Sequence, residues 1–208
     1  MSIPAAGTFS YGRAVAAITL ILVCAVLRRP LEADPVTHML VQLPALSWAG
    51  WLLAGAIPSG WLEERVSRLN ENGLPGLLIA LFAIAYWMLP RSIDSALTSP
   101  VAEFAKFITV PILIGLPLRW SWDRAHPLVR GVLKSNALSM CGVLAWLYSA
   151  APVRVCNSYL IDDQRRLGIA FLCVAIGLAI IWSVRLFFPP DYRTGGNRVT
   201  GFSRNRPA

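Results

Sequence analysis

The sequence predicts an all-α protein, a polytopic transmembrane helix bundle of about six helices with both termini in the cytoplasm. Of the 208 residues, 56% are hydrophobic and only 14% are charged, whereas a soluble domain usually carries about a quarter charged residues. The apolar residues are gathered in blocks, and about twenty such residues cross a bilayer. We therefore expect one transmembrane domain over residues 1–188 and a basic, flexible cytoplasmic tail over residues 189–208.

Each expected span is an apolar block bounded by charged residues or by proline. Pro44, Pro111 and Pro117 lie inside spans, where neighbouring helices can satisfy the carbonyls that a proline leaves free. The segment 61–73 carries adjacent acidic and basic residues and predicts a short amphipathic helix on the cytoplasmic surface. The six blocks are residues 11–27, 37–57, 74–90, 101–118, 132–151 and 167–188.

The first block has a second interpretation, because Arg13 followed by the apolar run Ala14–Leu27 resembles a secretory signal peptide. No small-x-small cleavage site precedes Arg28 and Arg29. We therefore expect this block to be retained as the first transmembrane helix.

The orientation follows from the basic residues, since cytoplasmic loops retain positive charge. With the N-terminus inside, twelve of the 19 Lys and Arg residues flank cytoplasmic helix ends. The net charge of +8 thus reflects membrane topology, and the basic residues form no surface with interleaved aromatics of the kind that binds nucleic acid. We expect membrane lipids as partners and no nucleic acid.

The unusual residues gather at the opposite, non-cytoplasmic helix ends, where ionisable groups cost free energy unless they are paired or hydrated. The candidate metal ligands are His38, Met39, Met88, Cys156 and Asp163, because thioether and thiol groups suit Cu(I). Each has a structural alternative: an interface hydrogen bond for the histidine, packing for the methionines and a helix cap for the aspartate.

Other site candidates share this membrane face. Gln42 stands one helical turn after His38, so both could face a shared ligand. Glu103 and Lys106 are three residues apart, and Asp94 could join them through Arg91 in an ion-pair network that locks helix ends. Gln164 precedes the last block.

Enzymatic chemistry is not expected. The sequence contains no Walker A loop, nucleophile elbow, HExxH motif or CxxCH motif. With His38 and His126 as its two histidines, bis-histidine ligation of haem at one site is not expected either.

Three segments, THMLVQLPAL, WMLPRSIDSALTSPVAEFAKF and LIDDQRRLG, resemble in their order the CtaG family, bacterial membrane proteins linked to assembly of the caa3-type cytochrome c oxidase. That family shows an HMxxH-like pattern, a WHxPxxYDxAL-like pattern and a D-Q pair before a late helix. The matching residues here are His38, Met39, Trp87, Pro90, Asp94, Ala96, Leu97, Asp163 and Gln164.

The departures from the family pattern concern its histidines. Gln42 and Met88 stand where the family has histidines, and the stretch Glu103–Phe107 has none. Either His38, Met39, Met88 and Cys156 form a softer Cu(I) site, or the scaffold has another use.

The resemblance implies an assembly or accessory factor for a respiratory, cytochrome c oxidase-type complex in the bacterial inner membrane. Its partners would be subunits of that complex, and it would handle copper at the periplasmic face. The alternatives are a non-catalytic structural subunit and, last, a small transporter with Glu103, Lys106 and Lys134 as gating charges. Against the transporter, no internal repeat relates the two halves of the chain.

Overall fold

The computed structural model describes residues 9–57, 69–152, 156 and 158–187. Of these described residues 87% are helical and none lies in a strand, which confirms the all-α fold class. The tail over residues 189–208 and most of the amphipathic segment at 61–73 lie outside the described residues. The helices are α1 (Tyr11–Val26), α2 (Arg28–Ala33), α3 (Pro35–Thr37), the π-helix η1 (His38–Gln42), α4 (Leu43–Ala56), α6 (Leu74–Trp87), α7 (Pro90–Thr98), α8 (Pro100–Val110), the π-helix η2 (Pro111–Gly115), α9 (Leu116–Trp122), α10 (Pro127–Ala150) and α11 (Ile161–Phe187).

Each of the six expected blocks contains a helix, but only part of the set has the length and apolarity of a membrane span. Among the described residues, three continuous helices qualify, namely Pro35–Ala56, Pro100–Trp122 and Ile161–Arg185. The pair α6 and α7 would make a fourth, bent by 69° at its break. The structure is therefore that of a protein with three or four candidate spans, and the number of six and the terminal orientation stay predictions.

Two of these long helices widen locally into a π-helical turn for the same reason. In η1 the backbone N–H of Leu43 donates to the carbonyl of His38, and in η2 that of Leu116 donates to Pro111. A proline, Pro44 or Pro117, follows each donor. Proline has no N–H, and its ring collides with the carbonyl four residues earlier, so the turn opens to the five-residue spacing.

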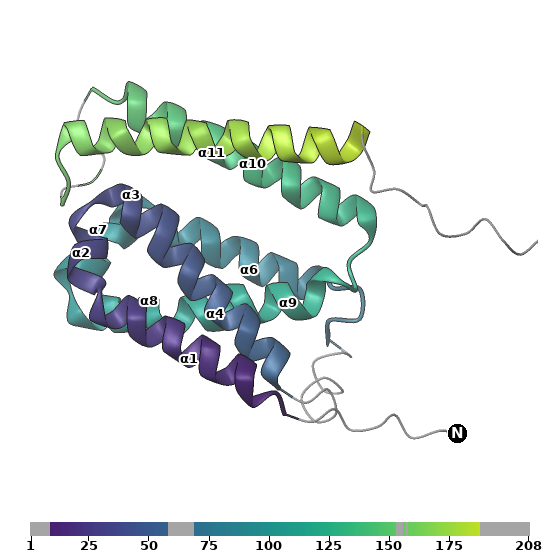
Figure 1. The fold of residues 1–208 in the computed structure, drawn as a ribbon. Coiled ribbons are helices and arrows are strands. Elements are labelled where there is room, and N and C mark those ends of the chain that lie inside the picture. The colour runs from purple at the N-terminus through teal and green to yellow at the C-terminus, as the bar shows by residue number, and fades with distance from the viewer. Residues whose placement is uncertain (1–8, 58–68, 153–155, 157, 188–208) are drawn as a thin grey trace, which may run out of the picture.

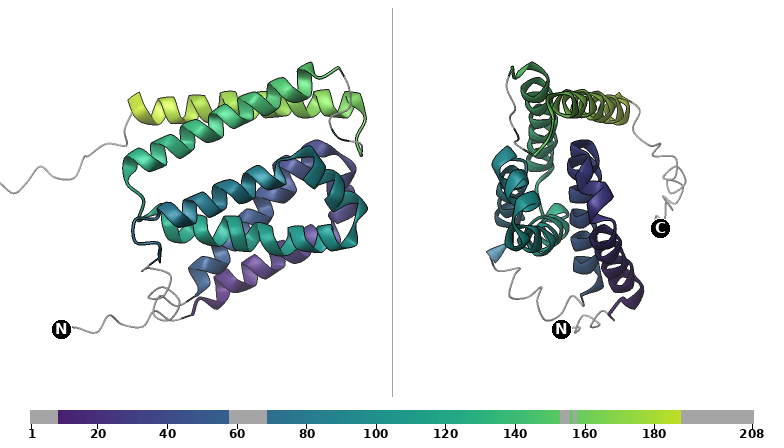
Figure 2. Two further views of the ribbon diagram at one scale, coloured as in Figure 1. Left: turned by 180° about the vertical axis from the view of Figure 1, so that it is seen from behind. Right: turned by 90° about the vertical axis from the view of Figure 1, so that its left-hand side faces the viewer.

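The helices form two groups (Figures 1 and 2). Helices α1, α4, α6 and the rod α8–η2–α9 pack side by side, and the short helices α2, α3 and α7 close one end of this group. Helices α10 and α11 form an antiparallel hairpin that lies alongside and contacts α3. The short helices at the closed end bring the polar residues of several segments together.

Glycine allows two of the rods to cross in close contact. A Cβ atom on Gly50 of α4 would lie 2.1 Å from the backbone oxygen of Pro111, and one on Gly115 would lie 2.2 Å from that of Ser47. Small residues permit this approach between transmembrane helices. The crossing fixes α4 against η2.

The hairpin is joined to the rest by an apolar cluster, which we call the Met39 cluster. Residues from η1, α7, α10, the following loop and α11 contribute to it, and Met88 packs against it. Its buried members are Met39, Ile93, Leu144, Ala145, Tyr148, Cys156, Tyr159, Leu167 and Phe171. This cluster lies next to the polar residues at the closed end of the molecule.

Candidate functional site

A buried polar network surrounds the ammonium group of Lys106, and we call it the Lys106 network. It consists of Glu32 from α2, His38 and Gln42 from η1, Lys106 from α8 and Tyr159 from the loop before α11. Lys106 and Gln42 are fully buried, and His38 is 1% exposed. Charged side chains inside a helical membrane bundle are rare and need partners, so this cluster is the first candidate for a site.

Lys106 uses all of its donors inside this network. Its Nζ atom forms a salt bridge with Oε1 of Glu32, donates to Oε1 of Gln42 at 3.1 Å and lies 3.3 Å from Nε2 of His38. Gln42 also donates from Nε2 to Oε1 of Glu32 at 3.0 Å. A protonated lysine has three N–H donors, so the geometry satisfies the ammonium group completely.

The tyrosine hydroxyl fixes the tautomer of His38. Tyr159 donates its one O–H to the backbone carbonyl of Glu32 at 2.9 Å, while Nδ1 of His38 lies 3.0 Å from the same hydroxyl. The hydroxyl must then accept from Nδ1–H, which leaves Nε2 as an acceptor for Lys106. A metal could reach the Nε2 lone pair only by displacing the ammonium group.

The local sequence explains how these groups meet. His38 and Gln42 are four residues apart and lie on one face of η1, as the sequence predicts, and the partner they share is Lys106. Asp34 caps the helical segment before them, because its Oδ2 accepts from the N–H of Thr37 at 3.2 Å. This cap sets the direction in which the helix enters the bundle.

The expected Glu103–Lys106–Asp94 network has different partners in the structure. Glu103 pairs with Arg28, and Lys106 pairs with Glu32. Asp94 instead accepts a hydrogen bond from the backbone N–H of Ser158 at 3.1 Å. The two ion pairs tie α2 to α8, and Asp94 anchors the loop before α11.

The three sulfur-containing candidate ligands lie in or against the Met39 cluster. Met39 and Cys156 are buried in the Met39 cluster, and Met88 packs against it. Burial, reinforced by the negative charge of Asp94, raises the pKa of the Cys156 thiol to about 11. The thiol is therefore protonated at neutral pH and is no preformed thiolate ligand.

Of the two candidates in the last helix, Asp163 lies apart from both groups, whereas Gln164 contacts a member of the Met39 cluster. Asp163 lies in the first turn of α11, 3.7 Å from Nη1 of Arg166, with its side chain 30% exposed. Gln164 is buried, and its Nε2 lies 3.5 Å from the carbonyl oxygen of Tyr148. The five predicted metal ligands are thus divided among a polar network, an apolar cluster and a surface pair, and the described residues hold no group of three or more His, Cys, Asp or Glu side chains placed for a metal ion.

Sequence reasoning missed Glu32 and Tyr159 as members of the Lys106 network, and Arg28 as the partner of Glu103. Glu32 and Arg28 stand in the connector between the first two apolar blocks, which reads as a polar turn. The available signal was that an apolar block contains a lysine, which needs a carboxylate partner. Glu32 is 74 positions from Lys106 in the sequence, and such a separation does not indicate which carboxylate is the partner.

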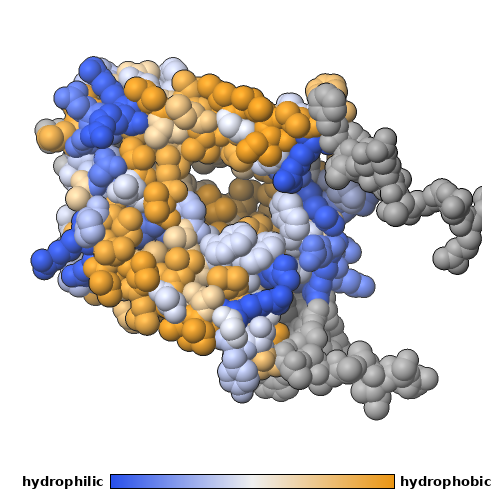
Figure 3. Space-filling view, in the orientation of Figure 1, coloured by the Kyte–Doolittle hydropathy of each residue, from blue (hydrophilic) through white to orange (hydrophobic). Residues whose placement is uncertain are grey.

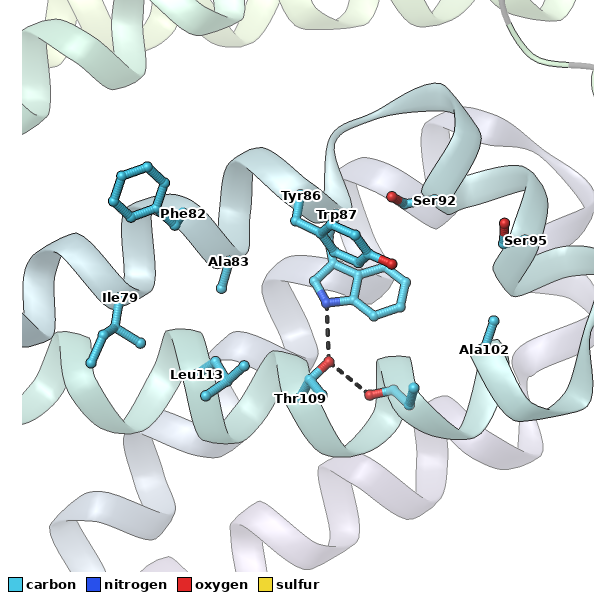
Figure 4. A pocket seen from close by; sticks show the side chains of 11 residues that line it. Ile79, Phe82, Ala83, Tyr86, Trp87, Ser92, Ser95, Ala102, Thr109 and Leu113 are labelled. Carbon is cyan, nitrogen blue, oxygen red and sulfur yellow. Dashed lines mark hydrogen bonds between the residues drawn. The ribbon is translucent and has the colours of Figure 1, made fainter.

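A separate groove of about 520 Å³ lies between α6, α7 and α8 (Figure 4). The indole N–H of Trp87 donates to Thr109 at 3.1 Å, and the Thr109 hydroxyl donates to the carbonyl of Ala105 at 2.7 Å. None of the described residues that line the groove is charged. The tryptophan of the WMLP segment therefore has its polar atom satisfied inside the helix pair.

The chain matches no protein-family model, and comparisons with curated proteins and with solved structures gave no match either. The part of the chain that the structure describes is all-helical, with three helices long and apolar enough to span a membrane, or four if the bent pair is one span.

Proposed function

We propose that this chain is a multi-pass protein of the bacterial inner membrane that serves as an assembly or accessory factor for a respiratory complex of the cytochrome c oxidase type. The proposal assigns it no enzymatic reaction. It takes up the resemblance of three sequence segments to the CtaG family.

The observation that carries the proposal is the convergence of these three segments in space. Met39, Ile93 and Leu167, one from each segment, are buried in the same apolar cluster. Lys106 of the second segment also contacts His38 of the first. Segments far apart in the chain therefore build one end of the molecule, as expected if the resemblance reflects a shared scaffold.

The Lys106 network supports a scaffolding role for this end. Every donor of the ammonium group has a partner, and a satisfied buried network favours one arrangement of the helices that contribute to it. In this proposal it locks α2, η1 and α8 so that the non-cytoplasmic surface keeps one shape for a partner subunit.

The test is deletion of the gene in the bacterium that carries it. We expect assembled oxidase, measured from the reduced-minus-oxidised haem spectrum of membranes, to fall severalfold and to return when the wild-type chain is supplied. An unchanged haem spectrum and unchanged oxygen consumption would contradict the proposal.

A non-catalytic structural subunit is the alternative, and the wild-type strain, which makes the protein, separates it from an assembly factor. The mature complex is purified and its protein composition is measured. An assembly factor should be absent from the mature complex, whereas a subunit should be present in fixed stoichiometry.

We further propose that any Cu(I) handled by the factor binds on the apolar side, at the sulfur atoms of Met39, Met88 and Cys156. The shared cluster of these three residues supports this choice, since soft thioether and thiol ligands favour Cu(I). His38 is excluded from this set because both of its ring nitrogens have partners in the Lys106 network.

Competition with a calibrated chelator under anaerobic conditions measures this binding. The double variant Met39→Leu/Met88→Leu keeps the apolar volume and should weaken Cu(I) binding by about tenfold or more. Met140→Leu is the matched control, because Met140 is a methionine outside the Met39 cluster. Equal affinities in all three proteins would remove copper from the proposal.

A further inference from the structure

A long apolar cavity separates the α10–α11 hairpin from the rest of the bundle. Its volume is about 610 Å³, within the range of ordinary small-molecule pockets. One wall comes from η1, α6 and α9, and the other from α10 and α11. Figure 3 shows it as an opening through the molecule, bordered by hydrophobic residues.

The cavity has one polar end and one apolar end. Lys134 and Asn136 on α10 are its polar lining residues apart from the thiol of Cys141. Met39 and Leu144 line the opposite end, next to the Met39 cluster. From Lys134 to Leu144 the helix rises about 15 Å, which equals about half of the roughly 30 Å hydrocarbon core, or one leaflet.

The mouth at Lys134 has the composition of a lipid headgroup site. The Lys134 ammonium group lies 6.0 Å from the ring centre of Trp122 and 5.9 Å from that of Trp182. Lys134 is exposed and, among the residues that the structure describes, makes no ion pair with a carboxylate. Tryptophan and lysine are the residues that anchor proteins at the level of the headgroups.

Lys134 follows a basic stretch of the sequence, which favours an anionic headgroup. The segment 116–134 carries Arg119, Arg124, Arg130 and Lys134 but only one acidic residue, Asp123. Basic clusters at the cytoplasmic ends of helices attract anionic lipids. Protein interiors seldom contain empty voids larger than a water molecule, and water is not favoured between apolar walls. A hydrocarbon chain is therefore the occupant that suits this cavity.

We propose that the cavity holds an acyl chain of one anionic phospholipid, whose phosphate is bound by Lys134 between Trp122 and Trp182. The lipid fills the space between the hairpin and the bundle from the leaflet on the Lys134 side. This inference goes beyond the assembly role, and either can fail without the other.

The experiment is native mass spectrometry of the detergent-purified full chain, titrated with phosphatidylglycerol and with phosphatidylcholine of identical acyl chains. The wild-type protein should bind one phosphatidylglycerol at least about tenfold more tightly than phosphatidylcholine. Lys134→Gln should remove this preference. The headgroup assignment would be overturned if the wild-type protein bound the two lipids with equal affinity. It would also be overturned if Lys134→Gln still preferred phosphatidylglycerol.

Two matched variants test the acyl-chain site. Ala137→Phe fills the cavity and should weaken binding of both lipids about tenfold, whereas Ile180→Phe, at an exposed position of α11 outside the cavity lining, should bind as the wild type does. Ala80→Leu fills the cavity from the other wall and serves if Ala137→Phe does not fold. The proposal would be overturned if a folded cavity-filling variant bound lipid as the wild type does, or if the wild type bound no lipid. The cavity would then be assigned to a partner helix or a second copy.

Discussion

Lys106 is the residue on which the closed end of the molecule depends. Its ammonium group contacts Glu32, His38 and Gln42, and it is fully buried. Removing one member of a buried ion pair leaves the other charge uncompensated, which typically costs about 3–5 kcal/mol. Replacing both members by neutral groups is much less costly.

We therefore predict that Lys106→Met lowers the free energy of unfolding in mild detergent by about 3 kcal/mol or more. The double variant Lys106→Met/Glu32→Gln should recover most of that loss. The matched control is Arg28→Gln, which breaks the more exposed pair with Glu103 and should cost at most about 1 kcal/mol. A double variant as unstable as the single one would show that the pair does not dominate the network.

Cys156 gives a prediction about pH. Its pKa is raised to about 11, first by burial and then by Asp94, so the thiol keeps its proton at neutral pH. A copper ion that binds the thiolate must release that proton. The apparent Cu(I) affinity should then rise about tenfold for each pH unit between about pH 7 and 9, well below the raised pKa.

Chelator competition at several pH values measures this slope. Cys156→Ser should flatten it, whereas Cys173→Ser, which changes an exposed thiol on α11, should not. A slope that is unchanged in Cys156→Ser would remove this thiol from the copper site.

At the scale of the elements, the crossing of α4 and η2 is a close backbone contact that requires glycine. A Cβ atom on Gly50 would lie 2.1 Å from the Pro111 oxygen, which belongs to the backbone and cannot turn away. We predict that Gly50→Ala destabilises the protein by about 1–3 kcal/mol, the usual cost of overpacking.

Gly177→Ala on α11 is the control, because nothing lies within 4 Å of the added Cβ atom. This substitution should be neutral or stabilising by up to about 1 kcal/mol. Both changes are measured as the midpoint of thermal unfolding in the same detergent. Equal midpoints for the two variants would contradict the close crossing.

The sequence anticipates much of the helical structure for physical reasons that act locally. Apolar blocks and flanking prolines place helices such as α6 and α10 near their observed positions, and the spacing of His38 and Gln42 correctly indicates a shared face. Pro44 and Pro117 each free the carbonyl four residues earlier, but the turn before Pro111 in the same rod stays α-helical, so the sequence alone does not predict which turn widens.

The partners within the site could not be predicted, because they depend on how distant segments fold together. Glu103 and Lys106 are neighbours on one helix, yet each pairs with a residue of α2. Tyr159 reaches the carbonyl of Glu32 from a position 127 residues away. The bend of 69° between α6 and α7 is by contrast a local feature, because Leu89 precedes Pro90 and has the extended backbone that a following proline favours.

At the scale of the whole molecule, the start of α1 and the end of α11 lie at the same end of the bundle (Figure 1). We predict that reporter fusions at the two termini give the same side of the membrane, with both facing the cytoplasm because basic residues gather there. The measurement is the activity of paired cytoplasmic and periplasmic reporters at each terminus. Opposite results at the two termini would contradict the orientation and require an odd number of spans.

The most direct test of the proposed assembly role is complementation of the deletion strain with the wild-type gene or with Lys106→Met/Glu32→Gln, and with an empty vector as the control. The reduced-minus-oxidised haem spectrum of membranes reports the assembled oxidase. We predict loss of the oxidase signal with the empty vector and recovery with both the wild type and the double variant, because the network has a structural role. A normal oxidase signal in the empty-vector strain would contradict the assembly role. A double variant that folds but does not restore the signal would contradict the structural role of the Lys106 network.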